Sequence, residues 1–268
     1  MAIHEIQNIA HVAEKKDLKL AATTYRVPSI DPGILKQLWH IYFEYYTDTS
    51  EDLFRHDLSR KSHVIVLWDK HNNSIQGFST FHTYHTQFGT RRIAVFFSGD
   101  TVVRKEYWGQ TAALHLAFVR NAYLFWLRNV PTPTYWFLLT KGYRTYLLLS
   151  RNSVNYYPRH DRETPPFEKT LIDHLAREKF GDAWKPEEGV VRFDKPAGRL
   201  RENVAPIRLD LLKYSDIRFF NQMNPRHVSG EELCCIGKLD LGTMFGYFGK
   251  RGRKVLKRVW RGNNGKRL

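Results

Sequence analysis

The rhythm of apolar and polar positions changes along residues 92–146, and this stretch organises the rest of the chain. Residues 92–103 are apolar, aromatic and β-branched over a length typical of a buried strand. From about Glu106, apolar residues recur at helical spacing, which predicts a helix with a broad apolar face. Pro131 and Pro133 end this helix, and residues 134–139 form a second buried strand. The pattern predicts a strand–helix–strand unit.

The corner between that first strand and the helix is a candidate phosphate site. The first N–H groups of a helix lack intrahelical acceptors, and the helix dipole favours negative charge there. Further elements are predicted on both sides of this unit. The expected strands are 20–27, 63–68, 76–88 and 189–193, and the expected helices are 32–46, 51–59, 142–150, 167–180 and 214–223.

Pro158, Pro165 and Pro166 mark a boundary in the chain. They suggest an α/β core over residues 1–157, a region over 158–237 that completes the sheet or caps a cleft, and a basic segment over 238–268. Hydrophobic content of 42% and aromatic content of 14% supply a sizeable core.

The adjacent residues Cys234 and Cys235 cannot form a disulfide framework, which favours a reducing, cytoplasmic setting. No signal peptide and no run near the ~20 apolar residues of a membrane-spanning helix is evident. No Cys/His spacing typical of a metal site is present, so no metal is expected.

The formal net charge is +15, and it is concentrated at the C-terminal end. From Lys238 onward there are ten Lys or Arg residues against one acid, Asp240. Such a surface attracts nucleic acid, an acidic membrane or an acidic carrier protein. Residues 253–261 would form a basic helix that either lies on the inner face of a membrane or packs on its own domain. Nucleic acid is less favoured, because few aromatic residues accompany these charges.

The corner motif resembles that of a known family. Residues 103–114 (VRKEYWGQTAAL) look like the acyl-donor motif of the GNAT (GCN5-related) N-acyltransferases, which has a Q/R-x-x-G-x-G/A core. Gly109 and Gln110 fit a common variant, whereas Trp108, Thr111 and Ala113 depart from it. The resemblance covers about 64–157 and implies a mixed α/β (α+β) fold: a mostly antiparallel sheet with a splayed strand pair, flanking helices and here a C-terminal helical extension.

The resemblance also implies roles for individual residues. Backbone N–H groups of the donor strand would polarise the thioester carbonyl, and those of the corner would hold the phosphate of the pantetheine arm. The residues at these positions are Thr101, Val102, Val103, Trp108, Gly109, Gln110, Thr111, Ala112 and Ala113. A tyrosine on the helix after the second strand would protonate the leaving thiolate, and Tyr143 and Tyr146 lie in that region.

A base for the amine can be sought on the strands. His82 shares one strand face with Phe78, Thr80 and Tyr84, and Asp100 shares one with Phe96 and Ser98. If the strands pair, His82 and Asp100 converge on the cleft and form a basic pair. The alternative is that His82 is a hydrogen-bonded structural residue.

Aromatic residues are dense around the expected cleft and suggest a long acyl chain. They are Phe78, Phe81, Phe96, Phe97, Tyr123, Phe125, Trp126, Tyr135, Trp136 and Phe137. The combined hypothesis is an N-acyltransferase moving a fatty acyl group from acyl-CoA, or from an acidic acyl carrier protein, to an amine of an amino acid or peptide. The alternative is a basic nucleic-acid-binding or membrane-associated protein on an inactive acyltransferase-like fold, which the departures at Thr111 and Ala113 support.

Overall fold

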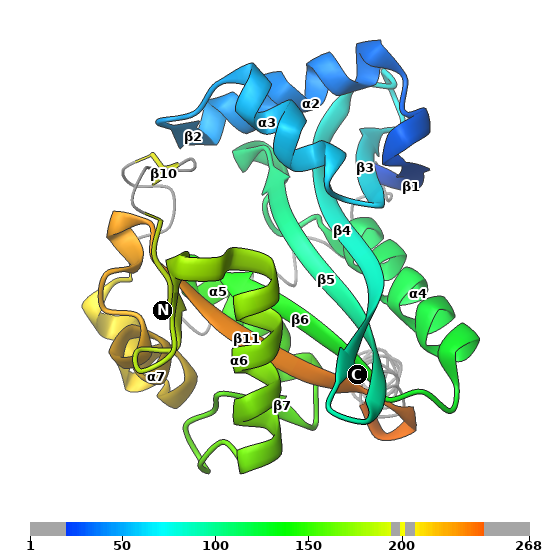
Figure 1. The fold of residues 1–268 in the computed structure, drawn as a ribbon. Helices are drawn as coiled ribbons and strands as arrows, with labels where there is room; N and C mark the ends of the chain where they lie inside the picture. Colours follow the sequence, from blue (N-terminus) through cyan, green and yellow to red (C-terminus); the bar gives the residue numbers. More distant parts are fainter. Residues whose placement is uncertain (1–19, 194–198, 202–206, 244–268) are drawn as a thin grey trace, which may run out of the picture.

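The computed structural model describes residues 20–193, 199–201 and 207–243 (Figure 1). The predicted basic helix over 253–261 lies outside these ranges, as do the first residues of the chain. Within the described ranges, every helix is too short or too polar to span a bilayer.

Local sequence signals start the helices of the first half as predicted. The Asp31 carboxylate accepts from the Gly33 N–H at 2.8 Å and Pro32 occupies the first helical turn, while the Ser50 hydroxyl accepts from the Leu53 N–H at 3.2 Å. The elements of this half are β1 (Leu20–Arg26), α2 (Pro32–Tyr45), β2 (Tyr46–Thr47), α3 (Glu51–Ser59), β3 (His63–Asp69), β4 (Ile75–Phe88) and β5 (Arg91–Val103).

The predicted strand–helix–strand unit is present, but its helix begins at Ala112 rather than near Glu106. A short 3₁₀ turn (Lys105–Tyr107) and an open bend replace the expected first turn. The elements from here on are α4 (Ala112–Asn129), β6 (Thr134–Thr140), α5 (Tyr143–Asn152), β7 (Tyr156–Tyr157), α6 (Pro166–Phe180), β8 (Trp184–Lys185), β9 (Val190–Val191), β10 (Arg199–Leu200), α7 (Ser215–Met223) and β11 (Glu232–Leu239).

The main sheet has the order β1-β3-β4-β5-β6-β11-β9-β8, with β7 also paired to β11. Its pairs are antiparallel except β5 with β6, which are parallel. A mixed α/β fold with a mostly antiparallel, open sheet is therefore confirmed. A separate two-stranded sheet joins β10 to β2.

Strand β11 was not predicted, although it lies beside β6 in the middle of the sheet. Its apolar run is short and continuous because it is buried on both faces, and such a run carries no clear period. Gly237 interrupts the run, yet the strand needs a small residue there. An added Cβ would come within 2.9 Å of both Leu149 and Ser153 on the α5 side. β11 also spans the expected boundary between residues 237 and 238.

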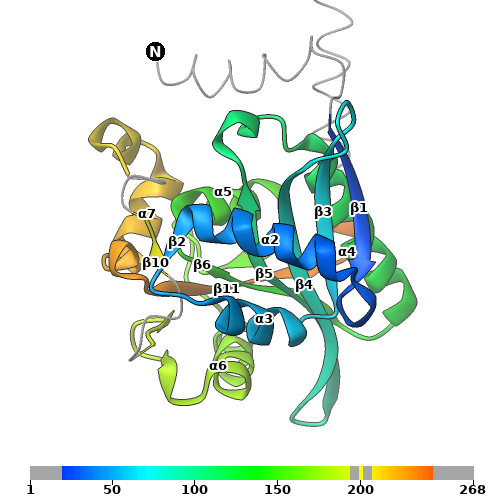
Figure 2. The ribbon, with the colours of Figure 1, turned by 90° about the horizontal axis from the view of Figure 1, so that it is seen from above.

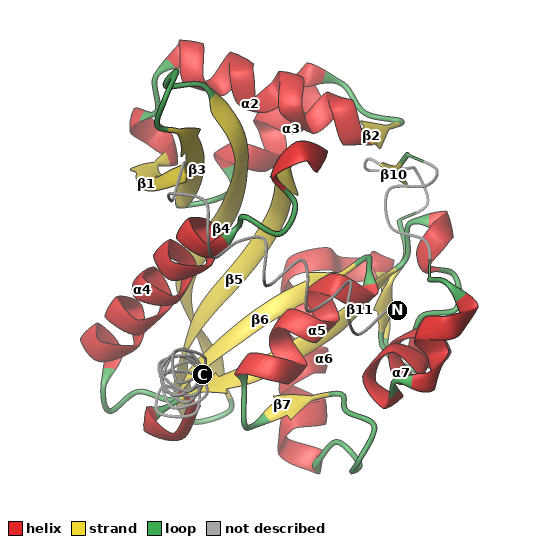
Figure 3. Cartoon of the chain, turned by 180° about the vertical axis from the view of Figure 1, so that it is seen from behind, coloured by secondary structure: helices red, strands yellow, loops and turns green. Residues whose placement is uncertain are grey.

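Helices cover both faces of the sheet (Figures 1, 2 and 3). Helices α4, α5 and α7 enclose one core cluster, which includes Phe96 and Tyr146. On the opposite face, α6 packs over Phe97 and Phe137, whereas α2 and α3 pack over Phe78. The strands in the middle of the sheet therefore present apolar side chains to the helical layers on both faces.

Candidate active site

Strands β5 and β6, in the middle of the sheet, pair along only part of their length. Strands β5 and β6 pair in parallel from Ala94 opposite Thr134 to Ser98 opposite Leu138. Strand β5 then continues to Val103 alongside β4 alone. The edge groups of β5 that a continuous sheet would satisfy therefore face a gap. The splayed strand pair that the family resemblance implies is present.

A β-bulge in β5 lies at the point of separation. The register with β4 shifts there, so that Gly99 and Asp100 together lie opposite Thr80. A Cβ at Gly99 would lie 2.4 Å from the Thr80 hydroxyl and 2.7 Å from Cε of Lys61, so a larger residue here would displace these side chains. The bulge also interrupts the simple alternation that was expected to place Asp100 on the same face as Ser98. After the bulge, the faces to which successive side chains point are exchanged, and this changes the direction of the Asp100 side chain.

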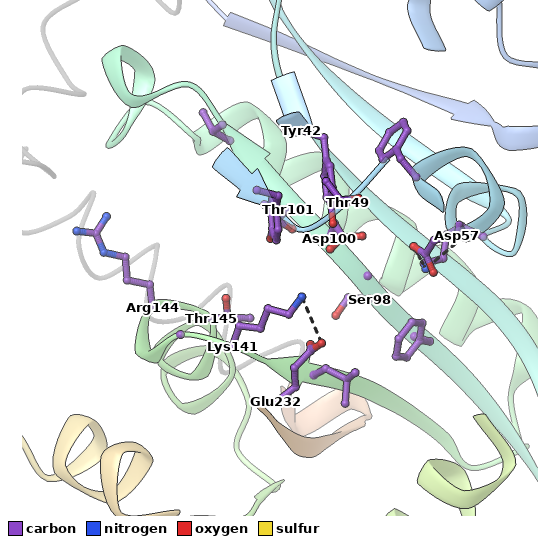
Figure 4. A pocket seen from close by; sticks show the side chains of 18 of the residues that line it. Tyr42, Thr49, Asp57, Ser98, Asp100, Thr101, Lys141, Arg144, Thr145 and Glu232 are labelled. Carbon is purple, nitrogen blue, oxygen red and sulfur yellow. Dashed lines mark hydrogen bonds and ion pairs between the residues drawn. The ribbon is translucent and has the colours of Figure 1, made fainter. Parts of the chain in front are cut away.

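A cavity of about 750 Å³ lies in the gap between the strands. Figure 4 shows Arg144 at one end and Asp57 at the other, with Asp100, Lys141 and Glu232 between them. The wall is built from β5, from the starts of α4 and α5, and from α2, α3, α6 and β11. Elements far apart in the sequence thus converge on one chamber.

The bend between β5 and α4 closes one end of the cavity without filling it. Gly109 has a φ of 87°, in the left-handed region that glycine adopts without steric penalty. The Trp108 indole N–H donates to the Val103 carbonyl at 2.8 Å, which fastens the bend to the strand that precedes it. Trp108, Gly109 and Thr111 all line the cavity.

This end of the cavity is suited to an anion. The first helical hydrogen bond of α4 is donated by the His115 N–H to the Thr111 carbonyl, so the N–H groups before it have no intrahelical acceptor. The Thr111 side chain makes no capping bond. The Arg144 guanidinium lies 4.9 Å from the ring centroid of Trp108 and also lines the cavity. A positive helix end and a guanidinium together favour a phosphate group.

The middle of the cavity holds a group of enclosed charges. The Lys141 Nζ lies 3.4 Å from the Glu232 carboxylate and 5.3 Å from the ring centroid of Tyr46. The Tyr46 ring stacks on that of Tyr42 with 4.2 Å between centroids. Asp100 lies on the β5 side of the same chamber (Figure 4). Two carboxyl groups therefore flank the position of one ammonium group.

Burial and neighbouring charges shift the pKa values of these groups. Burial raises the pKa of the Asp100 carboxyl, and the negative charge of Asp57 raises it further. The ammonium groups of Lys61 and Lys141 oppose this shift without cancelling it. Burial also raises the pKa of Glu232 against the attraction of Lys141. Burial by itself would lower the pKa of Lys141, but the charge of Glu232 leads the interactions that raise it above its usual value. The lysine stays charged, whereas the carboxyl groups become better proton acceptors.

Both predicted tyrosine donors lie away from the cavity. Tyr146 is fully buried, and its hydroxyl donates to the Pro158 carbonyl at 3.0 Å. Burial raises its pKa well above the usual range. Tyr143 packs into the same core cluster. The helical register explains this outcome, because Arg144 and Thr145 line the cavity from the other side of α5.

His82 and Asp100 are not brought together in the chamber. His82 lies opposite Phe97 in the β4–β5 ladder and is not among the residues that line the cavity, whereas Asp100 is. Burial lowers the pKa of the His82 imidazole, and the charges of Lys179 and Lys61 lower it further. The charges that act on His82 therefore weaken it as a base, contrary to the effect of the expected carboxylate partner.

The predicted donor-binding residues fall into two groups. The residues that line the cavity are Thr101, Val103, Trp108, Gly109 and Thr111. Val102 instead packs in the core beneath α2 and α3, and the Gln110 N–H donates to the Tyr107 carbonyl at 2.9 Å. Ala112 and Ala113 supply N–H groups in the first turn of α4. Among the aromatic residues expected around the cleft, Phe97 lines the cavity.

The structure adds lining residues that the sequence did not single out, notably Lys141, Glu232 and Arg144. Lys141 lies two residues beyond the predicted strand over 134–139 and precedes Gly142, so a lone charge near a strand end was an available signal. Glu232 begins the strand that the sequence did not reveal. The stacked pair Tyr42 and Tyr46 has the helical spacing of ordinary core residues, so its position at the chamber could not be predicted from the sequence.

Within the described ranges, no group of three or more His, Cys, Asp or Glu side chains is arranged to hold a metal ion. No protein-family model matches the chain, and no curated protein matches it.

Solved structures of acyltransferases are similar to the chain at a low level. An aminoglycoside acetyltransferase from an uncultured soil metagenomic sample is 17% identical over 49% of this chain and 84% of its own, with a TM-score of 0.34. A probable N-acyltransferase from Enterococcus faecalis V583 is 10% identical over 83% of this chain and 67% of its own, with a TM-score of 0.37. The GNAT family N-acetyltransferase YhbS from Escherichia coli is 15% identical over 48% of this chain and 67% of its own, with a TM-score of 0.34.

Similarities this low assign no activity or substrate. The mostly antiparallel sheet and the separation of β5 from β6 are consistent with the GNAT-like fold that the motif at residues 103–114 implies.

Proposed function

We propose that this protein is an N-acyltransferase that moves an acyl group from a pantetheine thioester to an amine. The observation that carries this proposal is the continuity of one cavity through the strand gap, from the N-terminus of α4 to the enclosed carboxyl groups. A thioester arm and an amine can meet there from opposite ends.

The end of the cavity formed by the bend between β5 and α4 is suited to the phosphate groups of a pantetheine arm. The free N–H groups at the start of α4, the Thr111 hydroxyl and the Arg144 guanidinium would hold its phosphate groups. The unpaired edge of β5 beyond Ser98 offers backbone N–H groups to the carbonyl of the acyl group. CoA and an acidic acyl carrier protein present the same phosphopantetheine arm, and these residues suit either carrier.

The thioester supplies the activated acyl group: its C–S bond breaks as the C–N bond of the amide forms. The leaving thiolate takes up the proton that the attacking nitrogen loses on becoming an amide, so that a free thiol is released. The amine must lose a proton before it attacks, and Asp100 is suited to accept it because burial raises its pKa. Lys141 remains charged beside it and stabilises negative charge that develops in the chamber.

The acyl group is proposed to be larger than acetyl. Beside the charged groups, the cavity is lined by apolar side chains, among them Phe54, Phe97 and Phe180. Each CH₂ group buried against such a wall contributes ~0.8 kcal/mol. A fatty acyl group therefore gains affinity in this chamber, in addition to what the phosphate end provides.

The test combines calorimetric binding with thiol release for acetyl-, octanoyl- and palmitoyl-CoA and for an octanoyl carrier protein. Arg144→Gln should weaken donor binding by about tenfold or more, because a charge-assisted contact to phosphate is lost. Arg151→Gln, an exposed position on the same helix, serves as the matched control and should bind like the unaltered protein. Absence of binding by every thioester would refute the proposal.

A further inference from the structure

A cluster of cations surrounds the end of the cavity that is remote from Arg144. Arg60 and Lys61 follow α3, Lys179 lies in the last turn of α6, and all of them line the cavity. The Lys179 Nζ lies 4.2 Å from the ring centroid of Phe97, and the Lys61 Nζ lies 5.9 Å from the same centroid. Two ammonium groups from separate elements therefore converge on one aromatic ring in the wall.

The charges within this cluster are incompletely compensated. Lys61 is paired with Asp57 at 2.6 Å, and its side chain is 6% exposed. Among the described residues, no carboxylate lies within ion-pair distance of Lys179. Burial and the like charges of Lys61 and Arg60 lower the pKa of Lys179 to about 8. Like charges held together in a partly buried site are destabilising unless an anion joins them.

We propose that this cluster binds the carboxylate of the acceptor, so that the amine substrate is a free amino acid or a similar amino carboxylic acid. This inference rests on the proposed N-acyltransferase function and names its acceptor class. The acceptor carboxylate contacts Lys179, with Arg60 and Lys61 adding positive potential. Its ammonium group is directed toward the carboxyl groups of Asp100 and Glu232 in the middle of the chamber.

The charge pattern also disfavours other amines. A polycationic amine would bring further positive charge to the cluster, and like charges held close together repel one another. A neutral carboxamide of the same amino acid would leave the cluster without its counter-ion. The distribution of charge in the cavity therefore selects a zwitterion, whose carboxylate faces the cations and whose ammonium group faces the carboxyl groups.

The experiment compares L-amino acids with their carboxamides, which share each side chain and amine. Calorimetry on the full chain measures binding, and thiol release from acetyl-CoA and octanoyl-CoA measures turnover. We expect the best acid to bind on the order of 10- to 100-fold more tightly than its carboxamide. Lys179→Gln should remove most of that preference and raise KM far more than it lowers kcat. Lys179→Arg should retain it.

Lys169→Gln provides the matched control, because Lys169 is an exposed lysine on the same helix and does not line the cavity. Arg60→Gln is a second test at an exposed position, and it should reduce the acid preference by a smaller factor than Lys179→Gln does. A thermal melt of each variant establishes that it is folded before its affinity is interpreted.

The outcomes separate this inference from the proposed function. Equal binding of acids and carboxamides, or an acid preference that survives in Lys179→Gln, overturns the inference. Acylation of amines such as spermine in place of amino acids also overturns it, yet leaves the acyltransferase function intact. If no thioester is turned over, the proposed function fails, and the calorimetric comparison of acid with carboxamide still decides whether the carboxylate site exists.

Discussion

The two ends of the cavity recognise charge by different means. The end formed by the bend before α4 offers mainly backbone N–H groups, supplemented by Arg144. The opposite end relies on the side chains of Arg60 and Lys61, which follow α3, and of Lys179 in α6. Backbone dipoles have a fixed position and do not titrate, whereas a partly buried lysine responds to its surroundings. The end at the bend before α4 is therefore suited to a group that all donors share, such as a phosphate, whereas the end at the lysines is suited to discriminating among acceptors.

The largest expected effect arises between the two ends, where the proposed proton acceptor lies. Asp100→Asn keeps the size and shape of the side chain but removes its basicity. We expect kcat to fall by about 10²- to 10⁴-fold, the usual contribution of general base catalysis. The binding of acyl-CoA should change little, because Asp100 is not part of the bend between β5 and α4.

Thiol-release kinetics and donor calorimetry on the same Asp100→Asn preparation check this pair of expectations. A variant that retains its kcat would move the role of base away from Asp100, with Glu232 as the next group to examine.

A smaller effect is expected in the pH dependence of KM, which should differ between the amino acid and the acyl donor. Lys179 is protonated below its pKa of about 8, so its attraction for a carboxylate is lost as the pH rises through that value. We expect KM for the amino acid to rise about tenfold over roughly two pH units, whereas KM for the donor stays constant because a guanidinium and backbone amides do not titrate there. Lys179→Arg should flatten the acceptor profile.

The lowered pKa of Lys179 also affects stability: raising the pH weakens the binding of the acceptor but increases the contribution of Lys179 to the free energy of unfolding. Between about 8 and its ordinary value of 10.5, Lys179 binds fewer protons in the folded chain than in the unfolded one, so its contribution to the free energy of unfolding rises with pH. The other titratable groups that act on it are Lys61, Arg60, Asp57, Glu178 and His82. Because the Asp57 pair and His82 lie close by, the acceptor profile should be measured against that of the Lys179→Arg variant.

The smallest effect is expected at a residue that belongs to neither end. Tyr146→Phe removes the hydroxyl that donates to the Pro158 carbonyl, which should lower the free energy of unfolding by about 1 kcal/mol. Both KM values and kcat should remain close to those of the unaltered protein, because Tyr146 does not line the cavity. Chemical denaturation and steady-state kinetics test this together. A large loss of kcat without a loss of stability would restore Tyr146 as the proton donor.

Local sequence patterns were sufficient to predict the strand–helix–strand unit from β5 to β6, apart from the start of its helix. Proline positions and the change from strand to helical period placed the unit from β5 to β6, and N-cap residues placed α2 and α3. The motif at residues 103–114 pointed to the bend between β5 and α4. These features depend on interactions between near neighbours in the chain, and short-range interactions leave a recognisable pattern in the residues themselves.

The chemistry of the chamber was decided by the tertiary structure. The bulge at Gly99 set the direction of Asp100, the register of α5 turned Tyr146 into the core and Arg144 toward the cavity, and β11 brought Glu232 to Lys141. A bulge shifts strand alternation by one residue, and a charge gains its altered pKa from groups distant in sequence. The sequence by itself therefore determined the bend between β5 and α4 and the strands and helix that flank it, whereas the charged groups that meet in the cavity depended on packing among strands and helices remote from one another.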